Sequence, residues 1–167
     1  MDHGKLAEIL FPEVETAPEY YENLYPKREL PQGAMITRLG PSPTGFIHLG
    51  NLYGAFIDER LARLSGGIFY LRIEDTDEKR FVEGAVETII DSLDFFGIDF
   101  DEGAGIQSEY GNYGPYFQSR RKDLYSCFAK VLVKKGYAYP CIMTEGEIAG
   151  TRKQQEEKKE TPGIYGK

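Results

Sequence analysis

The chain has 167 residues, of which 41% are hydrophobic and 28% charged, and its formal net charge is −7. This composition is typical of a folded domain, and the length suits one compact core or one domain with the start of another. No apolar run is long enough to span a bilayer, and the first residues lack the basic and then apolar pattern of a signal peptide. The negative charge argues against a surface devoted mainly to nucleic acid, which needs an excess of Lys and Arg.

The two cysteines, Cys127 and Cys141, match no metal-binding spacing and do not indicate a disulfide framework. We therefore expect a reducing, cytoplasmic compartment.

Residues 1–34 are a distinct segment punctuated by prolines. Prolines at this density exclude one long helix, because proline lacks the backbone N–H that a helix interior needs. An apolar patch over residues 6–11 favours a short helix over residues 3–10. We expect the rest of the segment to be an arm lying on the main body.

Residues 35–96 alternate between strand and helix patterns. Met35 to Leu39 is a short β-prone run that stops at the loop sequence of residues 40–45, Gly-Pro-Ser-Pro-Thr-Gly. Apolar residues then recur at helical spacing over 49–64, form a continuous strand-like run over 68–73, and recur at helical spacing over 82–96. This order predicts an α/β fold with a parallel sheet and right-handed crossovers.

The second half of the chain is less regular. Residues 101–116 are rich in glycine and predict a long loop, which is followed by a helix over 124–132 and a short strand over 137–143. Thr144 begins a capping-box sequence that predicts a helix start. The highly charged stretch 152–160 indicates a solvated helix or an unstructured end.

The first candidate site is the turn from residues 40–45 into His48-Leu49-Gly50-Asn51. A strand-to-helix turn directs backbone N–H groups and the positive end of the helix dipole at one point, which suits a phosphate. His48 can hydrogen-bond a phosphate or stabilise charge that develops there, and Gly50 lets a base or ribose approach closely. A capping or packing role for His48 is the alternative, and we favour it less among so many glycines, prolines and hydroxyl groups.

The second candidate site is the charged run from Arg72 to Asp77, at the end of the second predicted strand. Ligands of open α/β sheets bind outside the carboxyl ends of the strands, so this run should face the first loop. Arg38 offers a planar fork for a carboxylate, and Glu74 offers a counter-charge for an ammonium group. The pair predicts a ligand that carries both groups. The alternative is a surface network of salt bridges.

These motifs resemble those of the glutamyl-tRNA synthetases, which are class I aminoacyl-tRNA synthetases. The resemblance rests on residues 36–51 and on Leu71 to Asp77, and it continues through 100–103, 113–119 and 135–139. His48-Leu49-Gly50-Asn51 is similar to the class I signature His-Ile-Gly-His, with Leu49 and Asn51 as departures.

The resemblance implies a three-part organisation. Residues 1–34 would be an N-terminal extension, and residues 35–113 the first half of a Rossmann-like, HUP-like nucleotide-binding domain. Residues 114–167 would be the start of the insertion that binds the tRNA acceptor end. Arg120, Arg121, Lys122, Lys134 and Lys135 would approach acceptor phosphates there, or else form a solvated helix face.

The resemblance also implies the reaction, in which ATP activates glutamate and the glutamyl group passes to the 3′ end of tRNA(Glu). The implied contacts with glutamate come from Arg38, Gly40, Ser42 and Glu74. The implied contacts with ATP come from Pro41, Thr44, Gly45, His48, Gly50 and Asn51, and the catalytic residues among them would be His48, Gly50 and Asn51. Mg²⁺ would be carried on the ATP phosphates. The substrate carboxylate is the nucleophile, so no protein nucleophile is expected.

Three further points refine the resemblance. The sequences Pro-Ser-Pro-Thr-Gly at 41–45 and Glu-Asp-Thr-Asp at 74–77 match the glutamate enzymes rather than their glutaminyl relatives. Zinc-binding members carry Cys-x-Cys where this chain has Cys141 and Met143, so we expect no zinc. The second family signature, a Lys-Met-Ser-Lys-Ser-type loop, is not among the 167 residues, so we expect these residues alone to be inactive.

Three alternatives stay open. The first is a paralogue that attaches glutamate to a modified base of tRNA. The second is a module that only binds ATP, glutamate or a partner chain. The third is a nucleotidyltransferase of another family that uses a His-x-Gly-His turn.

Overall fold

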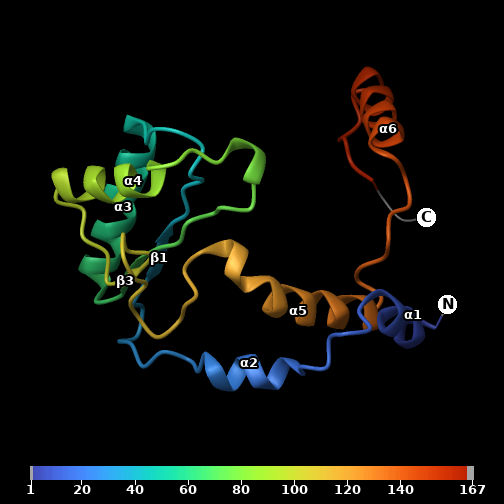
Figure 1. Cartoon of the computed structure of the whole chain (residues 1–167), viewed down its shortest axis with the longest axis horizontal. Helices are drawn as coiled ribbons and strands as arrows, with labels where there is room; N and C mark the ends of the chain where they lie inside the picture. The colour runs from blue at the N-terminus through green and yellow to red at the C-terminus, as the bar shows by residue number, and fades with distance from the viewer. Residues whose placement is uncertain (1, 165–167) are drawn as a thin grey trace. The chain divides into compact units, whose positions relative to one another are not determined.

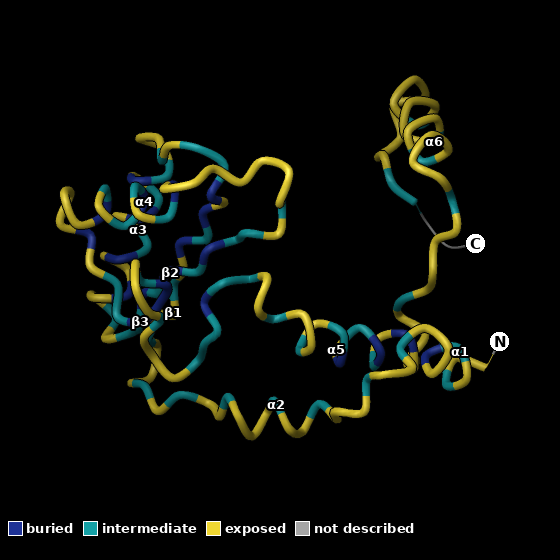
Figure 2. The backbone as a smooth tube through the Cα atoms, viewed as in Figure 1, coloured by how far each residue is buried: buried dark blue, intermediate teal, exposed yellow. Residues whose placement is uncertain are grey.

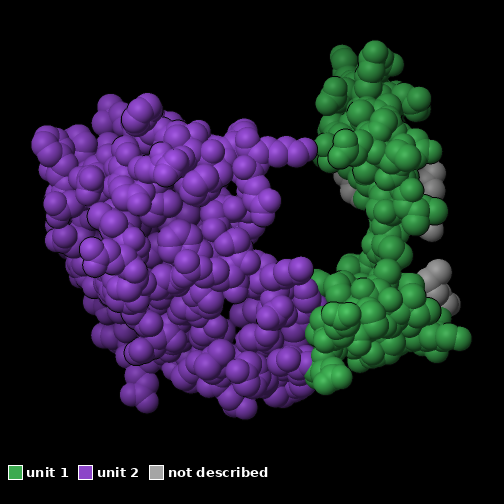
Figure 3. Space-filling model, in the orientation of Figure 1, with its two compact units in different colours: residues 1–15, 128–167 green, residues 16–127 purple. Residues whose placement is uncertain are grey.

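The computed structural model describes residues 2–164, which form two compact units (Figure 3). One unit consists of residues 16–127, and the other joins residues 1–15 to residues 128–167. The boundary falls within helix α5 (Lys122–Lys134). Over residues 2–164, every helix is too short or too polar to cross a bilayer.

The unit of residues 16–127 is built on a three-stranded parallel sheet, in the order β1-β2-β3. Figure 1 labels its two outer strands, β1 and β3. The strands are β1 (Ile36–Leu39), β2 (Ile68–Leu71) and β3 (Glu102–Gly103). The predicted α/β class is therefore confirmed. Strand β3 lies in the segment that we predicted to be a loop, because two residues are too few to show an alternating pattern.

Two helices follow the first two strands, α3 (Leu49–Ser65) and α4 (Ala85–Phe95), and α3 packs against β1 and β2. Figure 2 shows several of the buried residues of this region as dark blue stretches along the strands. Phe69 and Leu71 of β2 are fully buried, and so is Ile73, two residues after the strand. Ala55 and Ala62 of α3 and Ile89 and Leu93 of α4 belong to the same core. Burial on one side of each helix explains why the apolar spacing was visible in the sequence.

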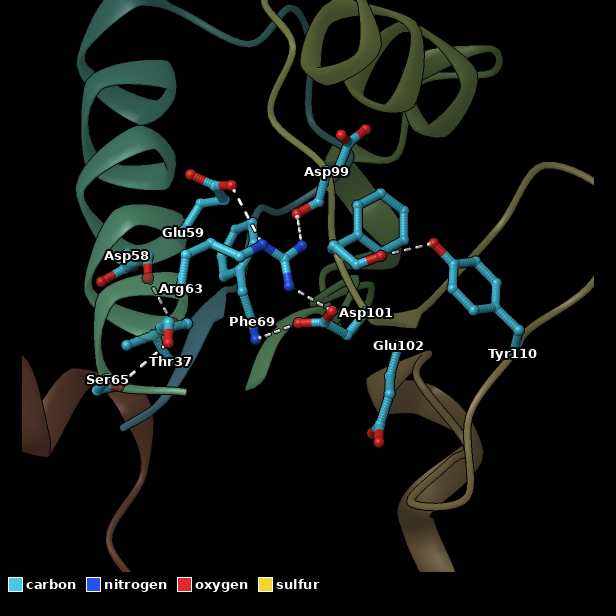
Figure 4. Close-up of polar contacts among 12 residues, drawn as sticks. Thr37, Asp58, Glu59, Arg63, Ser65, Phe69, Asp99, Asp101, Glu102 and Tyr110 are labelled. Carbon is cyan, nitrogen blue, oxygen red and sulfur yellow. Dashed lines mark hydrogen bonds and ion pairs between the residues drawn. The ribbon is translucent and has the colours of Figure 1, made fainter. Parts of the chain in front are cut away.

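A polar cluster ties α3 to the strands beside it (Figure 4). Arg63 donates to the Asp101 carboxylate at 2.5 Å and to the Asp99 carbonyl oxygen at 3.0 Å. The second Asp101 oxygen accepts from the Phe69 N–H at 2.9 Å, and Glu59 pairs with Arg63 at 3.3 Å. These contacts fix the position of the helix that begins after His48.

The arm contains a helix that the sequence pattern did not predict, α2 (Pro18–Leu24). Pro18 stands in the first turn, where its missing N–H removes no helical hydrogen bond. The prolines thus exclude a long helix and still allow two short ones. Two 3₁₀ turns complete this unit, η1 (Glu78–Arg80) and η2 (Gln118–Arg121).

The other unit contains α1 (His3–Leu10), as predicted, and the end of α5. The Lys130 ammonium group is buried and donates to the Glu8 carboxylate at 2.6 Å and to the Val14 carbonyl oxygen at 2.8 Å. Helix α5 is thereby joined to the segment that follows α1.

The capping box at Thr144 is confirmed. The Thr144 N–H donates to the Glu147 carboxylate at 2.7 Å, and the Glu147 N–H donates to the Thr144 hydroxyl at 3.3 Å. Helix α6 (Glu145–Glu157) follows, so the charged stretch is a solvated helix as far as Glu157.

The predicted strand over residues 137–143 is wrong, because this segment has no regular secondary structure. The Tyr137 N–H donates back to the Leu132 carbonyl oxygen at 2.9 Å, and Ile142 is 95% exposed. A strand needs a neighbouring strand to satisfy its backbone groups, and β1, β2 and β3 all belong to the unit of residues 16–127.

Candidate functional site

The two candidate loops face each other, as the strand order predicted. Both leave the carboxyl ends of neighbouring parallel strands, β1 and β2. The Glu74 N–H donates to the Pro41 carbonyl oxygen at 2.9 Å, and the Arg72 N–H donates to the Leu39 carbonyl oxygen at 3.0 Å. The site is therefore held together by backbone bonds that do not depend on side-chain rotamers.

A pocket of about 400 Å³ lies between the first loop and the start of α3. It is lined by Pro41, Ser42, Thr44, Gly45, Phe46, Ile47, His48, Asn51 and Ile89. Five of the six residues predicted to contact ATP are brought together here, with Ser42 beside them. The volume falls in the range of small-molecule sites.

Gly50, the sixth residue predicted to contact ATP, lines a neighbouring apolar groove instead, together with Leu49, Tyr53 and Phe56. Its lack of a side chain nevertheless affects the pocket, through His48. A Cβ atom at position 50 would lie 3.1 Å from two atoms of the His48 ring, closer than side chains normally pack. Gly50 therefore leaves room for the imidazole.

His48 is the N-cap residue of α3, and its side chain is exposed. Its backbone N–H donates to Asn51 Oδ1 at 3.4 Å, which gives Asn51 a capping contact. The imidazole thus stands at the positive end of the helix dipole, on the rim of the pocket. That position suits an anionic ligand, and a catalytic role for His48 stays a prediction.

Arg38 and Glu74 are brought together where the two loops leave the carboxyl ends of β1 and β2. Arg38 Nη1 lies 3.2 Å from Glu74 Oε1, and Arg72 Nη2 lies 3.0 Å from the same oxygen. The Arg38 side chain is 37% exposed, whereas that of Arg72 is only 16% exposed. One carboxylate therefore pairs with a largely buried arginine and with a more accessible one.

Gly40 is required for this arrangement. A Cβ atom at position 40 would lie 2.7 Å from Glu74 Oε1 and 3.4 Å from Arg38 Nε. Three of the residues predicted to bind glutamate, Arg38, Gly40 and Glu74, thus form one cluster. The fourth, Ser42, lies on the wall of the adjoining pocket.

Sequence reasoning missed the role of Arg72. Its signal was the two-residue spacing to Glu74, because residues i and i+2 of an extended chain lie on the same side. Asp58, on α3, is close enough to Arg38 for their charges to interact. Burial raises the pKa of the Asp58 carboxyl, and the charge of Arg38 acts in the opposite direction.

The remaining carboxylates of the second loop have protein partners. Asp75 accepts from the Ser119 N–H at 2.8 Å and from its hydroxyl at 2.6 Å. Asp77 pairs with Arg80 at 2.7 Å, which holds the pKa of that carboxyl below its usual value. Among residues 2–164, no group of three or more His, Cys, Asp and Glu side chains is placed to hold a metal ion.

Comparison with known proteins gives a consistent result. The chain is 61% identical over its whole length to a glutamate–tRNA ligase of Acetivibrio thermocellus, and 53% identical over 99% of it to one of Clostridium perfringens. It spans 31% of the length of each of these relatives.

Solved structures agree with the sequence comparison. The glutamate–tRNA synthetase of Elizabethkingia anophelis superposes with a TM-score of 0.66 at 38% identity, over 77% of this chain and 25% of that one. A glutamate tRNA ligase of Elizabethkingia meningosepticum, solved in complex with its amino acid, gives 0.64 at 37% identity, over 76% and 25%.

Residues 34–164 match the family model described as the catalytic domain of the class I tRNA synthetases (E and Q). That segment contains the pocket at the start of α3 and the Arg38–Glu74 cluster. The chain therefore belongs to the class I tRNA synthetase family (E and Q), as part of its catalytic domain.

Proposed function

We propose that this chain supplies the ATP and glutamate half-site of a glutamate–tRNA ligase, which joins glutamate to tRNA(Glu). The observation that carries the proposal is the Arg38–Glu74 pair. Its two members come from different strand ends and meet 3.2 Å apart, beside a pocket at the start of a helix. A group for a carboxylate, a group for an ammonium and a site for a phosphate are thus neighbours.

In this proposal, glutamate replaces the internal ion pair. Its side-chain carboxylate binds Arg38, its ammonium group binds Glu74, and Gly40 and Ser42 complete the contacts. ATP lies along the first loop and the start of α3, against Pro41, Thr44, Gly45, His48, Gly50 and Asn51.

The reaction needs positioning and charge stabilisation rather than a protein nucleophile. The α-carboxylate of glutamate attacks the α-phosphorus of ATP, the bond to the β-phosphate oxygen breaks, and pyrophosphate leaves. The imidazole of His48 and the N–H groups at the start of α3 face the charge that develops on the phosphate oxygens. Mg²⁺, carried by the ATP phosphates, would offset their negative charge. A ribose hydroxyl of the tRNA then displaces AMP from the glutamyl-adenylate.

The domain assignment is part of the same proposal. We assign residues 1–34 to an extension, 35–113 to the first half of the nucleotide-binding domain, and 114–167 to the start of the tRNA acceptor-binding insertion. We also propose a cytoplasmic location, which the cysteine pattern favours.

The basic residues proposed to face tRNA differ in their surroundings. Arg121 donates to the Pro115 and Tyr113 carbonyl oxygens at 2.7 and 2.6 Å, and Arg120 pairs with Glu109. In the other unit, Lys134 pairs with Glu8 at 2.9 Å. Arg121 thus has a supporting role, and Lys122 and Lys135, which are exposed, are better placed to meet phosphate groups.

The test is glutamate-dependent exchange of pyrophosphate into ATP by the complete product of the reading frame that encodes this chain. Exchange should require glutamate, and Arg38→Met and Glu74→Gln should abolish it. Arg60→Met, at an exposed arginine of α3, is the matched control and should not. Exchange that glutamine or aspartate supports equally well would contradict the proposal.

The product separates the proposal from its alternative. Mass spectrometry of tRNA should find glutamate on the terminal ribose, whereas glutamate on a base would identify a paralogue with another task. Robust exchange by residues 1–167 alone would contradict the expectation that they are inactive.

A further inference from the structure

The arm of residues 16–34 leads into the segment that matches the family model, and one of its contacts with that segment is a largely buried ion pair. Arg28 donates two hydrogen bonds to the Glu102 carboxylate, at 2.5 and 2.7 Å. The two side chains are only 14% and 12% exposed. The hydrogen bonds from Arg28 hold the pKa of the Glu102 carboxyl below its usual value, although burial acts in the opposite direction.

Aromatic residues enclose this pair. The Arg28 guanidinium carbon lies 3.5 Å from the centre of the Tyr113 ring, and the Tyr25 ring stacks on Tyr113 with centroids 6.3 Å apart. Tyr25 donates its hydroxyl to the Gly114 carbonyl oxygen at 2.6 Å, and Tyr113 donates to the Pro26 carbonyl oxygen at 2.8 Å. The arm therefore holds residues 113–114 by both side-chain and backbone groups.

A chain of hydrogen bonds connects the Glu102 carboxylate to the candidate site. Glu102 also accepts from the Tyr116 hydroxyl at 2.7 Å. Burial, with this hydrogen bond, raises the pKa of Tyr116 to about 12, so the hydroxyl stays a donor. The Tyr116 carbonyl oxygen accepts from the Ile73 N–H at 2.9 Å, and the Gln118 N–H donates to the Ile73 carbonyl oxygen at 2.9 Å. Ile73 directly precedes Glu74.

Arg63 cannot replace Arg28 as the partner of Glu102. Asp101 points toward Arg63, whereas the Glu102 carboxylate points away from Arg63 (Figure 4). Loss of Arg28 would leave a buried carboxylate without its bidentate partner, which is unfavourable enough to displace the groups that hold it.

We propose that residues 16–34 act as a clamp on the amino-acid half of the site, and that Arg28 is a positioning residue for Glu74. It acts through Glu102, Tyr116 and the backbone of Ile73. The proposal deepens the function proposed above and rests on it for the identity of the amino acid. If Arg28 only stabilised the unit as a whole, its loss would affect α3 as strongly as the segment beside the site.

The first measurement is NMR-detected amide hydrogen exchange of the 167-residue chain, which needs no ligand. In Arg28→Met, the amides of Ile73 and Gln118 should exchange faster by at least about tenfold. The amides of Ala55 and Ala62 in α3 should keep their rates. Arg28→Lys, which retains the charge, should restore part of the protection, and Arg60→Met should change nothing. Unchanged exchange at Ile73, or equal acceleration in α3, would overturn the proposal.

The second measurement uses the complete protein in glutamate-dependent pyrophosphate exchange. Arg28→Met should raise KM for glutamate by about tenfold and leave KM for ATP unchanged, because only the amino-acid half depends on the clamp. Faster exchange at Ile73 with an unchanged KM for glutamate would refute the positioning role. If the unsubstituted protein shows no dependence on glutamate, the proposed function fails, while the amide exchange still decides whether the clamp exists.

Discussion

Replacing Gly40 with alanine should perturb the proposed glutamate site at a single defined contact, the one with Glu74. The added methyl carbon would lie 2.7 Å from Glu74 Oε1 and 3.1 Å from the carboxylate carbon, inside van der Waals contact. The obstacle is a side chain, so the backbone of the parallel sheet can stay in place. Glu74 must therefore withdraw, and its contact with Arg38 at 3.2 Å must lengthen or break.

The expected effects on stability and on substrate binding differ in size. The Arg38 and Glu74 side chains are 37% and 29% exposed, and pairs this accessible contribute about 0.2–1 kcal/mol. The free energy of unfolding should fall by less than about 1 kcal/mol, which lowers Tm by at most about 4 °C in a chain of this size. Misplacing a substrate-binding group by about 1 Å costs up to about a hundredfold in catalysis. KM for glutamate should therefore rise by tenfold or more, by the same order-of-magnitude reasoning, and KM for ATP should change little.

The assay is pyrophosphate exchange by the complete protein, with thermal unfolding measured in parallel. Gly54→Ala is the matched control, because a Cβ atom at that position of α3 meets nothing within 4 Å. It should leave KM for glutamate unchanged and stabilise the helix by up to about 1 kcal/mol. A Gly40→Ala protein with normal KM for glutamate would refute the placement of Glu74 in the site.

Three further predictions concern stability. Phe69 is fully buried in β2, so Phe69→Ala should lower the free energy of unfolding by about 3–5 kcal/mol, measured by urea denaturation, and a loss below about 1 kcal/mol would contradict this packing. Thr144→Ala removes the N-cap of α6 and should destabilise that helix by about 1 kcal/mol, seen as faster amide exchange in α6 but not in α3. Because Arg28 lowers the pKa of Glu102 from its usual 4.5, their contribution should be complete above pH 4.5 and lost as the pH falls through the lower folded-state value. Urea denaturation across this pH range should show that loss, and Glu102→Gln should remove the part that this pair contributes.

The elements that could be predicted from the sequence are those whose burial against the core leaves a pattern in their own residues. The apolar spacing of α3 and α4 and the continuous run of β2 follow directly from contact with a single core. Once two parallel strands were identified, the meeting of their carboxyl-end loops followed from topology. The hydrogen bond from the Glu74 N–H to the Pro41 carbonyl oxygen joins the two loops where they meet.

The elements that sequence reasoning missed depend on distant partners. Strand β3 exists because Glu102 and Gly103 pair with Tyr70 and Leu71, which no local pattern reveals. The segment 137–143 has strand-like composition and lacks a described strand beside it. Arg28 and Glu102 are 74 positions apart, whereas Arg72 and Glu74 are two apart. The pairing of Arg72 with Glu74 could be predicted because residues i and i+2 of an extended chain lie on the same side, whereas no local rule predicts the pairing of Arg28 with Glu102.

The internal ion pair between Arg38 and Glu74 occupies the very groups that the proposal gives to glutamate. A ligand that carries a carboxylate and an ammonium group replaces each partner with one of the same sign, so neither charge is left unpaired. The contact that it displaces is partly exposed and therefore contributes at most about 1 kcal/mol. Arg72 is largely buried and keeps its own bond to Glu74, so the carboxylate need not reorient when Arg38 turns to the ligand. In the proposed function, the pair would thus hold both groups ready for glutamate at little energetic cost.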